Sequence, residues 1–99
     1  MTINTSVNGS AISLEIIGRL DTITAPELEA ELSKYADVAE SVEFDFSKLE
    51  YISSAGLRVL LSEQKAMNSK GGKMVLKNVN DTVMEVFEIT GFIDILTIE

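Results

Sequence analysis

Residues 41–65, SVEFDFSKLEYISSAGLRVLLSEQK, place a strand pattern and a helix pattern on either side of a run of small residues. Val42, Phe44 and Phe46 alternate with acidic residues, which predicts a strand with one apolar and one polar face. From Ser54 onward, leucines recur at helical spacing, and a serine hydroxyl can accept a hydrogen bond from a free N–H of the first turn. We therefore expect Ser54 to be the N-cap of a helix.

The chain before this stretch predicts two strands and a helix. Strands are predicted from Thr2 to Val7 and from Ala11 to Ile17, the second of which alternates apolar with polar residues. The Asn8-Gly9 dipeptide between them is typical of a hairpin. Thr24 precedes a proline and a glutamate at the spacing of a capping box, so a helix is expected to begin there.

The chain after this stretch completes an α/β pattern. Its predicted elements are a helix stop at Gly71-Gly72, a strand over residues 74–77, a helix capped by Asn80 or Asp81 and stopped by Gly91, and a strand over residues 93–98. The order is β-β-α-β-α-β-α-β. Because strands alternate with helices, we expect one α/β domain over residues 1–99, with a mixed and mostly parallel sheet, an antiparallel first strand, and helices mainly on one face.

The composition excludes several classes of function. Sixteen acidic and eight basic residues give a formal charge of −8, which repels nucleic acid and anionic membrane surfaces. The chain contains no histidine and no cysteine, so it has no Ser-His-Asp triad, no thiolate nucleophile and no nitrogen or sulfur metal ligands. We expect a non-enzymatic protein that has no catalytic residues, metal site or cofactor.

The apolar runs are also short. None approaches the roughly 20 residues that a helix needs to span a bilayer, and the first residues lack the basic and apolar pattern of a secretory signal. A cytoplasmic protein is the expectation.

Two loops are candidates for a functional site. The ends of parallel strands lie on one edge of a sheet, so the loops Gly18–Thr22 and Ser53–Gly56 are expected to bring Asp21 and Ser54 together. A second interpretation is that Asp21 and Ser54 are only turn and capping residues. A hydrolase elbow is excluded, because Ile52 stands where Gly-x-Ser-x-Gly needs its first glycine.

Five segments of the chain match one family in order: Gly18-Arg19-Leu20-Asp21, Asp45-Phe46-Ser47, Ser54-Ala55-Gly56-Leu57, Gly71-Gly72 and Thr90-Gly91-Phe92. Through them the chain resembles the STAS domains, and within these the bacterial anti-sigma factor antagonists, essentially from end to end.

The resemblance implies a binding module that is switched by phosphorylation. The serine that an anti-sigma factor serine kinase phosphorylates maps to Ser54, and a serine phosphatase removes the phosphate. The unphosphorylated form is expected to bind the kinase and so to release the sigma factor for transcription. The partner-binding residues that the resemblance implies are Asp21, Thr22, Ser53, Ser54, Ala55, Gly56 and Leu57.

The chain departs from the family pattern next to the implied phosphorylation site. Ser53 stands where the family has an aspartate, and Ala55 stands where it often has serine or threonine. Ser53 is therefore an alternative phosphate acceptor. The alternative function is that of a STAS subunit in a signalling or transport assembly, which binds its partner constitutively and without phosphorylation.

Overall fold

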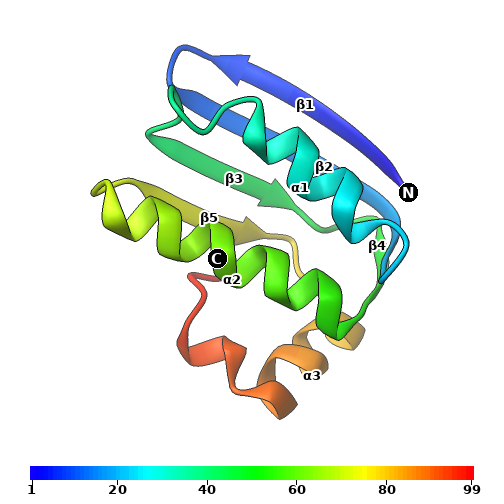
Figure 1. The fold of residues 1–99 in the computed structure, drawn as a ribbon. Coiled ribbons are helices and arrows are strands. Elements are labelled where there is room, and N and C mark those ends of the chain that lie inside the picture. Colours follow the sequence, from blue (N-terminus) through cyan, green and yellow to red (C-terminus); the bar gives the residue numbers. More distant parts are fainter.

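The computed structural model, which describes residues 1–99, places two helices side by side over one face of a five-stranded sheet (Figure 1). The strands are β1 (Thr2–Asn8), β2 (Ala11–Leu20), β3 (Ser41–Asp45), β4 (Leu49–Ile52) and β5 (Lys73–Lys77), and the helices are α1 (Ala25–Ser33), α2 (Ser54–Ser69), α3 (Asp81–Thr90) and the 3₁₀ turn η1 (Phe92–Asp94). None of these helices combines the length and the apolar character that crossing a bilayer requires.

The sheet has the mixed topology that was predicted. Its strand order is β1-β2-β3-β5, and β4 pairs separately with β2. β1 runs antiparallel to β2, and the other pairs are parallel. Asn8 is the last residue of β1 and pairs with Ala11, so the hairpin turn is made by Gly9 and Ser10, one residue later than the predicted Asn8-Gly9. Gly9 has a φ of 63° in this turn.

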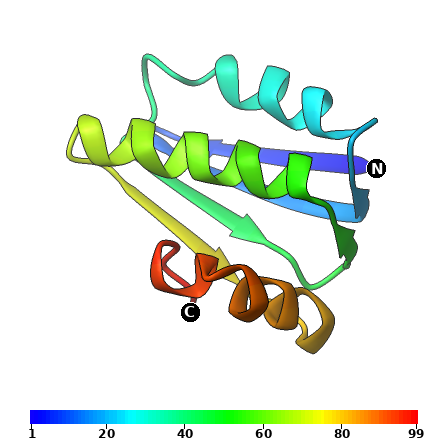
Figure 2. The same ribbon diagram turned by 60° about the horizontal axis from the view of Figure 1, so that its bottom comes forward.

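Alternation along the strands separates the two faces of the sheet. The residues buried beneath the helices include Ile12, Leu14 and Ile16 of β2, Val42 and Phe44 of β3, and Met74 and Leu76 of β5. α1 and α2 add Leu28 and Leu60, which are fully buried. Figure 2 shows α1 and α2 on the same side of the sheet, which confirms the prediction that helices pack mainly on one face.

α3 packs at the end of the sheet, against β4. The sequence predicts Asn80 or Asp81 as its N-cap, and the structure has Asn80 in this role. Asn80 Oδ1 accepts from Val83 N (2.9 Å). The amide of the same side chain donates to Leu49 O of β4 (2.6 Å), which ties the start of the helix to the strand. Gly91, with a φ of 81°, ends α3 in the left-handed conformation.

The predicted strand over residues 93–98 is wrong. After Gly91 the chain turns, and Ile95 N and Leu96 N both donate to Phe92 O (3.0 and 2.9 Å). These local hydrogen bonds keep the segment from extending beside β5. What remains is one isolated parallel bridge between Leu76 and Ile98.

β4 was not predicted as a separate strand. It is only four residues long, and its end residues Leu49 and Ile52 are buried while the two between them are exposed, so it has no alternating pattern. The strand exists because β2 is long enough to pair with β3 over its first half and with β4 over its end, after a register shift between Gly18 and Arg19.

Candidate functional site

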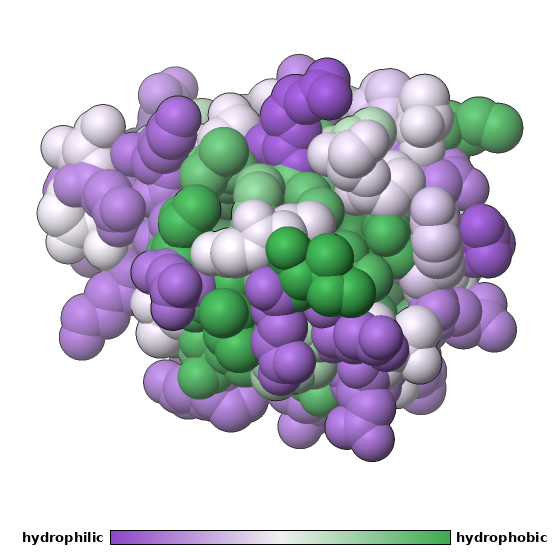
Figure 3. All heavy atoms as spheres, turned by 90° about the horizontal axis from the view of Figure 1, so that it is seen from below, coloured by the Kyte–Doolittle hydropathy of each residue, from purple (hydrophilic) through white to green (hydrophobic).

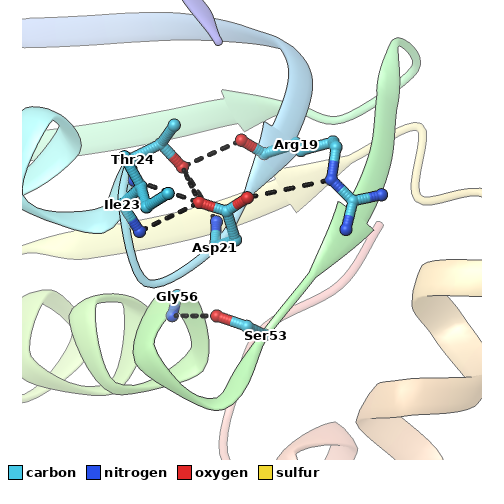
Figure 4. Close-up of polar contacts among 6 residues, drawn as sticks. All are labelled: Arg19, Asp21, Ile23, Thr24, Ser53 and Gly56. Carbon is cyan, nitrogen blue, oxygen red and sulfur yellow. Dashed lines mark hydrogen bonds and ion pairs between the residues drawn. The ribbon is translucent and has the colours of Figure 1, made fainter.

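Two loops leave the sheet side by side at the ends of β2 and β4. Leu20 pairs with Ile52 in the parallel register, so Asp21 and Ser53 are the first residues beyond the paired strands. The backbone N–H of Ser53 donates to Leu20 O at 2.9 Å and joins the loops directly. Figure 4 shows the Asp21 loop next to the first turn of α2. The structure therefore brings together the two loops that the sequence singled out.

Gly56 allows α2 to start this close to β2. A Cβ atom at position 56 would lie 2.7 Å from Leu20 Cγ and 2.9 Å from Ile52 Cγ1, both shorter than real contacts of that kind. Leu20 itself is fully buried. The side chain of Leu20 thus fills the space that a glycine leaves in the first turn of α2.

The N-cap of α2 is Ser53, and the prediction that Ser54 is the cap is wrong by one residue. Ser53 is extended (φ −97°, ψ 175°), and its Oγ accepts from Gly56 N at 3.4 Å. The bond from its backbone to Leu20 O holds Ser53 in the line of β4, so helical dihedrals begin only at the next residue. Ser54 is the first residue of α2; it is exposed, and its hydroxyl makes no hydrogen bond within the chain.

The shifted cap leads to a stability prediction. Ser53→Ala is expected to lower the free energy of unfolding by about 1 kcal/mol, because it removes the side chain that caps α2. Ser54→Ala is expected to change the free energy of unfolding by less than about 0.5 kcal/mol, because it removes only an exposed hydroxyl that has no hydrogen-bond partner. Urea titration of the two variants checks this, and equal losses, or a larger loss for Ser54→Ala, would contradict the assignment of the cap.

Asp21 holds its own loop together at the start of α1. Its Oδ1 accepts from Ile23 N (3.0 Å), Thr24 N (3.1 Å) and the Thr24 hydroxyl (3.2 Å), and its Oδ2 lies 3.7 Å from Arg19 Nε (Figure 4). The backbone N–H of Thr24 is the main reason that the pKa of Asp21 lies below its ordinary value; partial burial opposes this, and Ile23 N–H adds to it.

The side chain of Thr24 makes its hydrogen bonds within the loop and does not cap α1. It occupies the predicted N-cap position of α1, yet its hydroxyl makes no capping hydrogen bond there. The hydroxyl accepts from Asp21 N (2.8 Å), and its single proton is shared between two acceptors, Arg19 O (2.9 Å) and Asp21 Oδ1 (3.2 Å). Asp21 and Thr24 therefore fix each other, and Asp21 has the structural role that was one of its two interpretations.

The lowered pKa of Asp21 predicts that its contribution to the stability of the fold depends on pH. A carboxylate whose folded pKa is below its unfolded value stabilises the fold above the unfolded pKa, and this stabilisation is lost as the pH falls through the folded pKa. Asp21→Asn keeps the shape of the side chain without its charge. We expect wild type to melt above Asp21→Asn at neutral pH and the difference to vanish in strong acid, as thermal melts across the acid range would measure. A constant difference would contradict the prediction.

The remaining predicted partner-binding residues divide between the surface and the core. Thr22 and Ala55 line a groove of about 330 Å³ between α1 and α2, next to Ser54. Gly56 and Leu57 are buried beneath this surface, so they can position the first turn of α2 but cannot present side chains to a partner.

Sequence reasoning missed several exposed residues around the two loops. Ile23 is 84% exposed, and it is an apolar residue outside any helical or strand periodicity, which is the signal that could have identified it. Arg19 stacks over the ring of Tyr51 with 4.3 Å to its centroid. Arg58 lies in the groove, one turn after Ser54, and is exposed without an ion pair.

This arrangement can support two functions: binding of a partner and modification of a serine hydroxyl. No group of three or more His, Cys, Asp or Glu side chains is placed to hold a metal ion. The surface combines a free hydroxyl at a helix N-terminus, a fixed carboxylate and a groove. A helix N-terminus accommodates negative charge well.

Comparisons with known proteins agree on one family. The model of the STAS domain matches residues 2–99. BtrV of Bordetella bronchiseptica, which carries the name of an anti-sigma factor antagonist, is 43% identical over 82 residues, covering 82% of this chain and 71% of BtrV. The anti-sigma-B factor antagonist of Bacillus subtilis is 31% identical over 100 residues, covering 99% of this chain and 92% of that protein.

Solved structures show the same fold. The anti-sigma factor antagonist SpoIIAA in its unphosphorylated form superposes with a TM-score of 0.80 at 17% identity, over 99% of this chain and 87% of SpoIIAA. The phosphorylated form of the Bacillus protein superposes with a TM-score of 0.79 at 18% identity, over 99% of this chain and 91% of SpoIIAA.

Proposed function

Because the chain belongs to the STAS domain family, and within it to the anti-sigma factor antagonists, we propose that Ser54 is the phosphorylated residue of its switch. In this proposal the unphosphorylated protein binds an anti-sigma factor serine kinase, which then releases its sigma factor. Phosphorylation of Ser54 ends the binding, and a serine phosphatase restores it. The protein acts as a binding module and not as an enzyme, in the cytoplasm, where sigma factors direct transcription.

The observation that carries the proposal is the contrast between two adjacent hydroxyls. Ser54 Oγ is exposed and makes no hydrogen bond, so a kinase can reach it without breaking any contact. Ser53 Oγ accepts from Gly56 N, and its residue is held in line with β4 by the bond to Leu20 O. Modification of Ser53 would cost the cap of α2. Ser54 is therefore the acceptor that we favour, and Ser53 is the alternative.

A phosphate on Ser54 is expected to change the surface without unfolding the domain. It would add about −1.5 to −2 charges close to Asp21, on a chain whose formal charge is already −8. The free N–H groups at the start of α2 favour a negative charge at that position. Arg58, one turn further along α2, is a cation without a carboxylate partner and is within the same groove. SpoIIAA has the same fold with and without its phosphate.

The proposed partner-binding surface follows from the same geometry. Thr22 on one loop and Ala55 on the other line the groove between α1 and α2. Asp21, Ser53 and Ser54 are their neighbours in the same two loops. A partner that contacts both loops would meet the new phosphate at the centre of its interface. Loss of binding on phosphorylation therefore needs no conformational change.

The test is incorporation of phosphate by the anti-sigma factor serine kinase of the same organism, with ATP and magnesium. We expect intact-mass spectrometry to show one added phosphate on the wild-type chain and on Ser53→Ala, and none on Ser54→Ala. Phosphate retained in Ser54→Ala and absent from Ser53→Ala would transfer the role to Ser53. A wild-type chain that binds the kinase but is never phosphorylated would favour the constitutive STAS subunit.

A further inference from the structure

The face formed by α3 and η1 exposes apolar side chains that the proposed switch does not use. Figure 3, a view from below Figure 1, shows apolar residues gathered in the middle of this face. Ile89 of α3 is 77% exposed, and Ile93 of η1 and Ile95 at its end are 38% and 48% exposed. These three isoleucines, here called the α3–η1 patch, are three of the seven large apolar side chains that the chain exposes.

The α3–η1 patch is not explained by folding. Val86, one turn before Ile89, and Phe92 are half-buried against the core, and Phe87 and Leu96 of the same segment are buried in it. The core is therefore complete without the exposed isoleucines. A polar residue at each of those positions would leave the buried contacts unchanged and would remove apolar surface from water.

The segment that carries the patch is acidic. Residues 78–99 contain no Lys or Arg, and their carboxylate side chains are Asp81, Glu85, Glu88, Asp94 and Glu99. All five are exposed, and none takes part in any of the four ion pairs of the structure. No ion pair therefore neutralises their charges, and they give the segment that carries the patch a negative potential.

This charge selects between possible occupants of the patch. A second copy of the chain would bring a second set of five carboxylates against the first, and an anionic lipid surface would be repelled in the same way. A cationic and apolar surface would satisfy both the isoleucines and the carboxylates. We propose that the α3–η1 patch binds an amphipathic helix of a partner protein, in which Lys or Arg residues flank the apolar side chains.

The test uses a synthetic helical peptide of leucine and lysine, labelled with a fluorophore, and a matched peptide with glutamate in place of lysine. We expect the full chain to bind the Leu/Lys peptide in a fluorescence anisotropy titration, more weakly as salt is raised, and not to bind the Leu/Glu peptide. Ile89→Ser and Ile95→Ser should each weaken binding by about fivefold to tenfold. Ile23→Ser is the matched control, because it removes an isoleucine that is 84% exposed at another loop.

Amide shifts of the ¹⁵N-labelled chain locate the bound peptide. We expect perturbations to concentrate in residues 83–97 and to be absent from the groove between α1 and α2. The proposal is overturned if the wild-type chain does not bind the Leu/Lys peptide, if Ile23→Ser weakens binding as much as Ile89→Ser, or if the perturbations map to the groove. Sedimentation that shows a dimer of the free chain, dispersed by Ile89→Ser, would also overturn it, since the occupant would then be a second copy.

Discussion

Ser54→Asp is expected to lower the affinity for the anti-sigma factor kinase by at least about tenfold, because it places a second carboxylate next to Asp21 where a partner would dock. Ser54 is exposed at the first position of α2, so the new carboxylate would point to solvent and would leave the core intact. Ser54→Ala should bind about as well as wild type. Isothermal titration of each variant with the kinase measures the effect.

Two control variants separate the effect of a charge at position 54 from the effects of side-chain size and of the net charge of the chain. Ser54→Asn has the shape of the aspartate variant without its charge, so it should bind at least several times more tightly than Ser54→Asp. Ser69→Asp adds the same charge at an exposed position at the far end of α2, and it should bind like wild type. The loss in Ser54→Asp should also shrink at high salt. Equal binding by the Asp and Asn variants would show that the charge at position 54 does not control docking.

The second large effect concerns the packing beneath the two loops. Gly56→Ala is expected to lower the free energy of unfolding by about 1–3 kcal/mol, because the new Cβ would lie 2.7 Å from Leu20 Cγ and 2.9 Å from Ile52 Cγ1. Leu20→Ala should cost about 2–5 kcal/mol, because it leaves a cavity at a fully buried position.

The two changes should compensate each other in part. In the double variant the methyl group that Gly56→Ala introduces would enter the space that Leu20 vacates, so the loss should fall short of the sum of the single losses by about 0.5–3 kcal/mol. The contact with Ile52 remains and prevents complete compensation. Urea titrations of the four proteins give this coupling. Leu14→Ala, which removes a buried leucine from the middle of β2, is the matched control and should add to Gly56→Ala without coupling.

The elements that could be predicted from the sequence are those with a clear period or a clear terminus. β2 and β3 alternate, and α3 has both an amide cap at Asn80 and a glycine stop at Gly91. β4 could not be predicted, because its position depends on the end of β2, which extends beyond the part that pairs with β3. The chain after Gly91 is rich in isoleucine, as many strands are, but the local hydrogen bonds to Phe92 O prevailed over pairing with β5.

The candidate site could be predicted as a pair of loops but not in its details. Strand order was enough to place the loop of Asp21 beside the loop that starts α2, because parallel strands end on one edge. Two adjacent serines, however, carry the same local propensity for an N-cap, so the choice of Ser53 depends on a hydrogen bond to Leu20, which is distant in the sequence. The exposure of Arg58 in the groove is likewise a tertiary property. It follows from how α1 and α2 lie on the sheet.

The hydrogen bond from Ser53 N to Leu20 O involves main-chain atoms alone. Every residue at position 20 offers that carbonyl, and every residue except proline at position 53 offers that N–H. Mutation can therefore exchange the side chain at position 53 without moving the two loops apart. The backbone sets the distance between the two loops. The side chains on these loops can therefore change to fit a new partner while that distance stays constant.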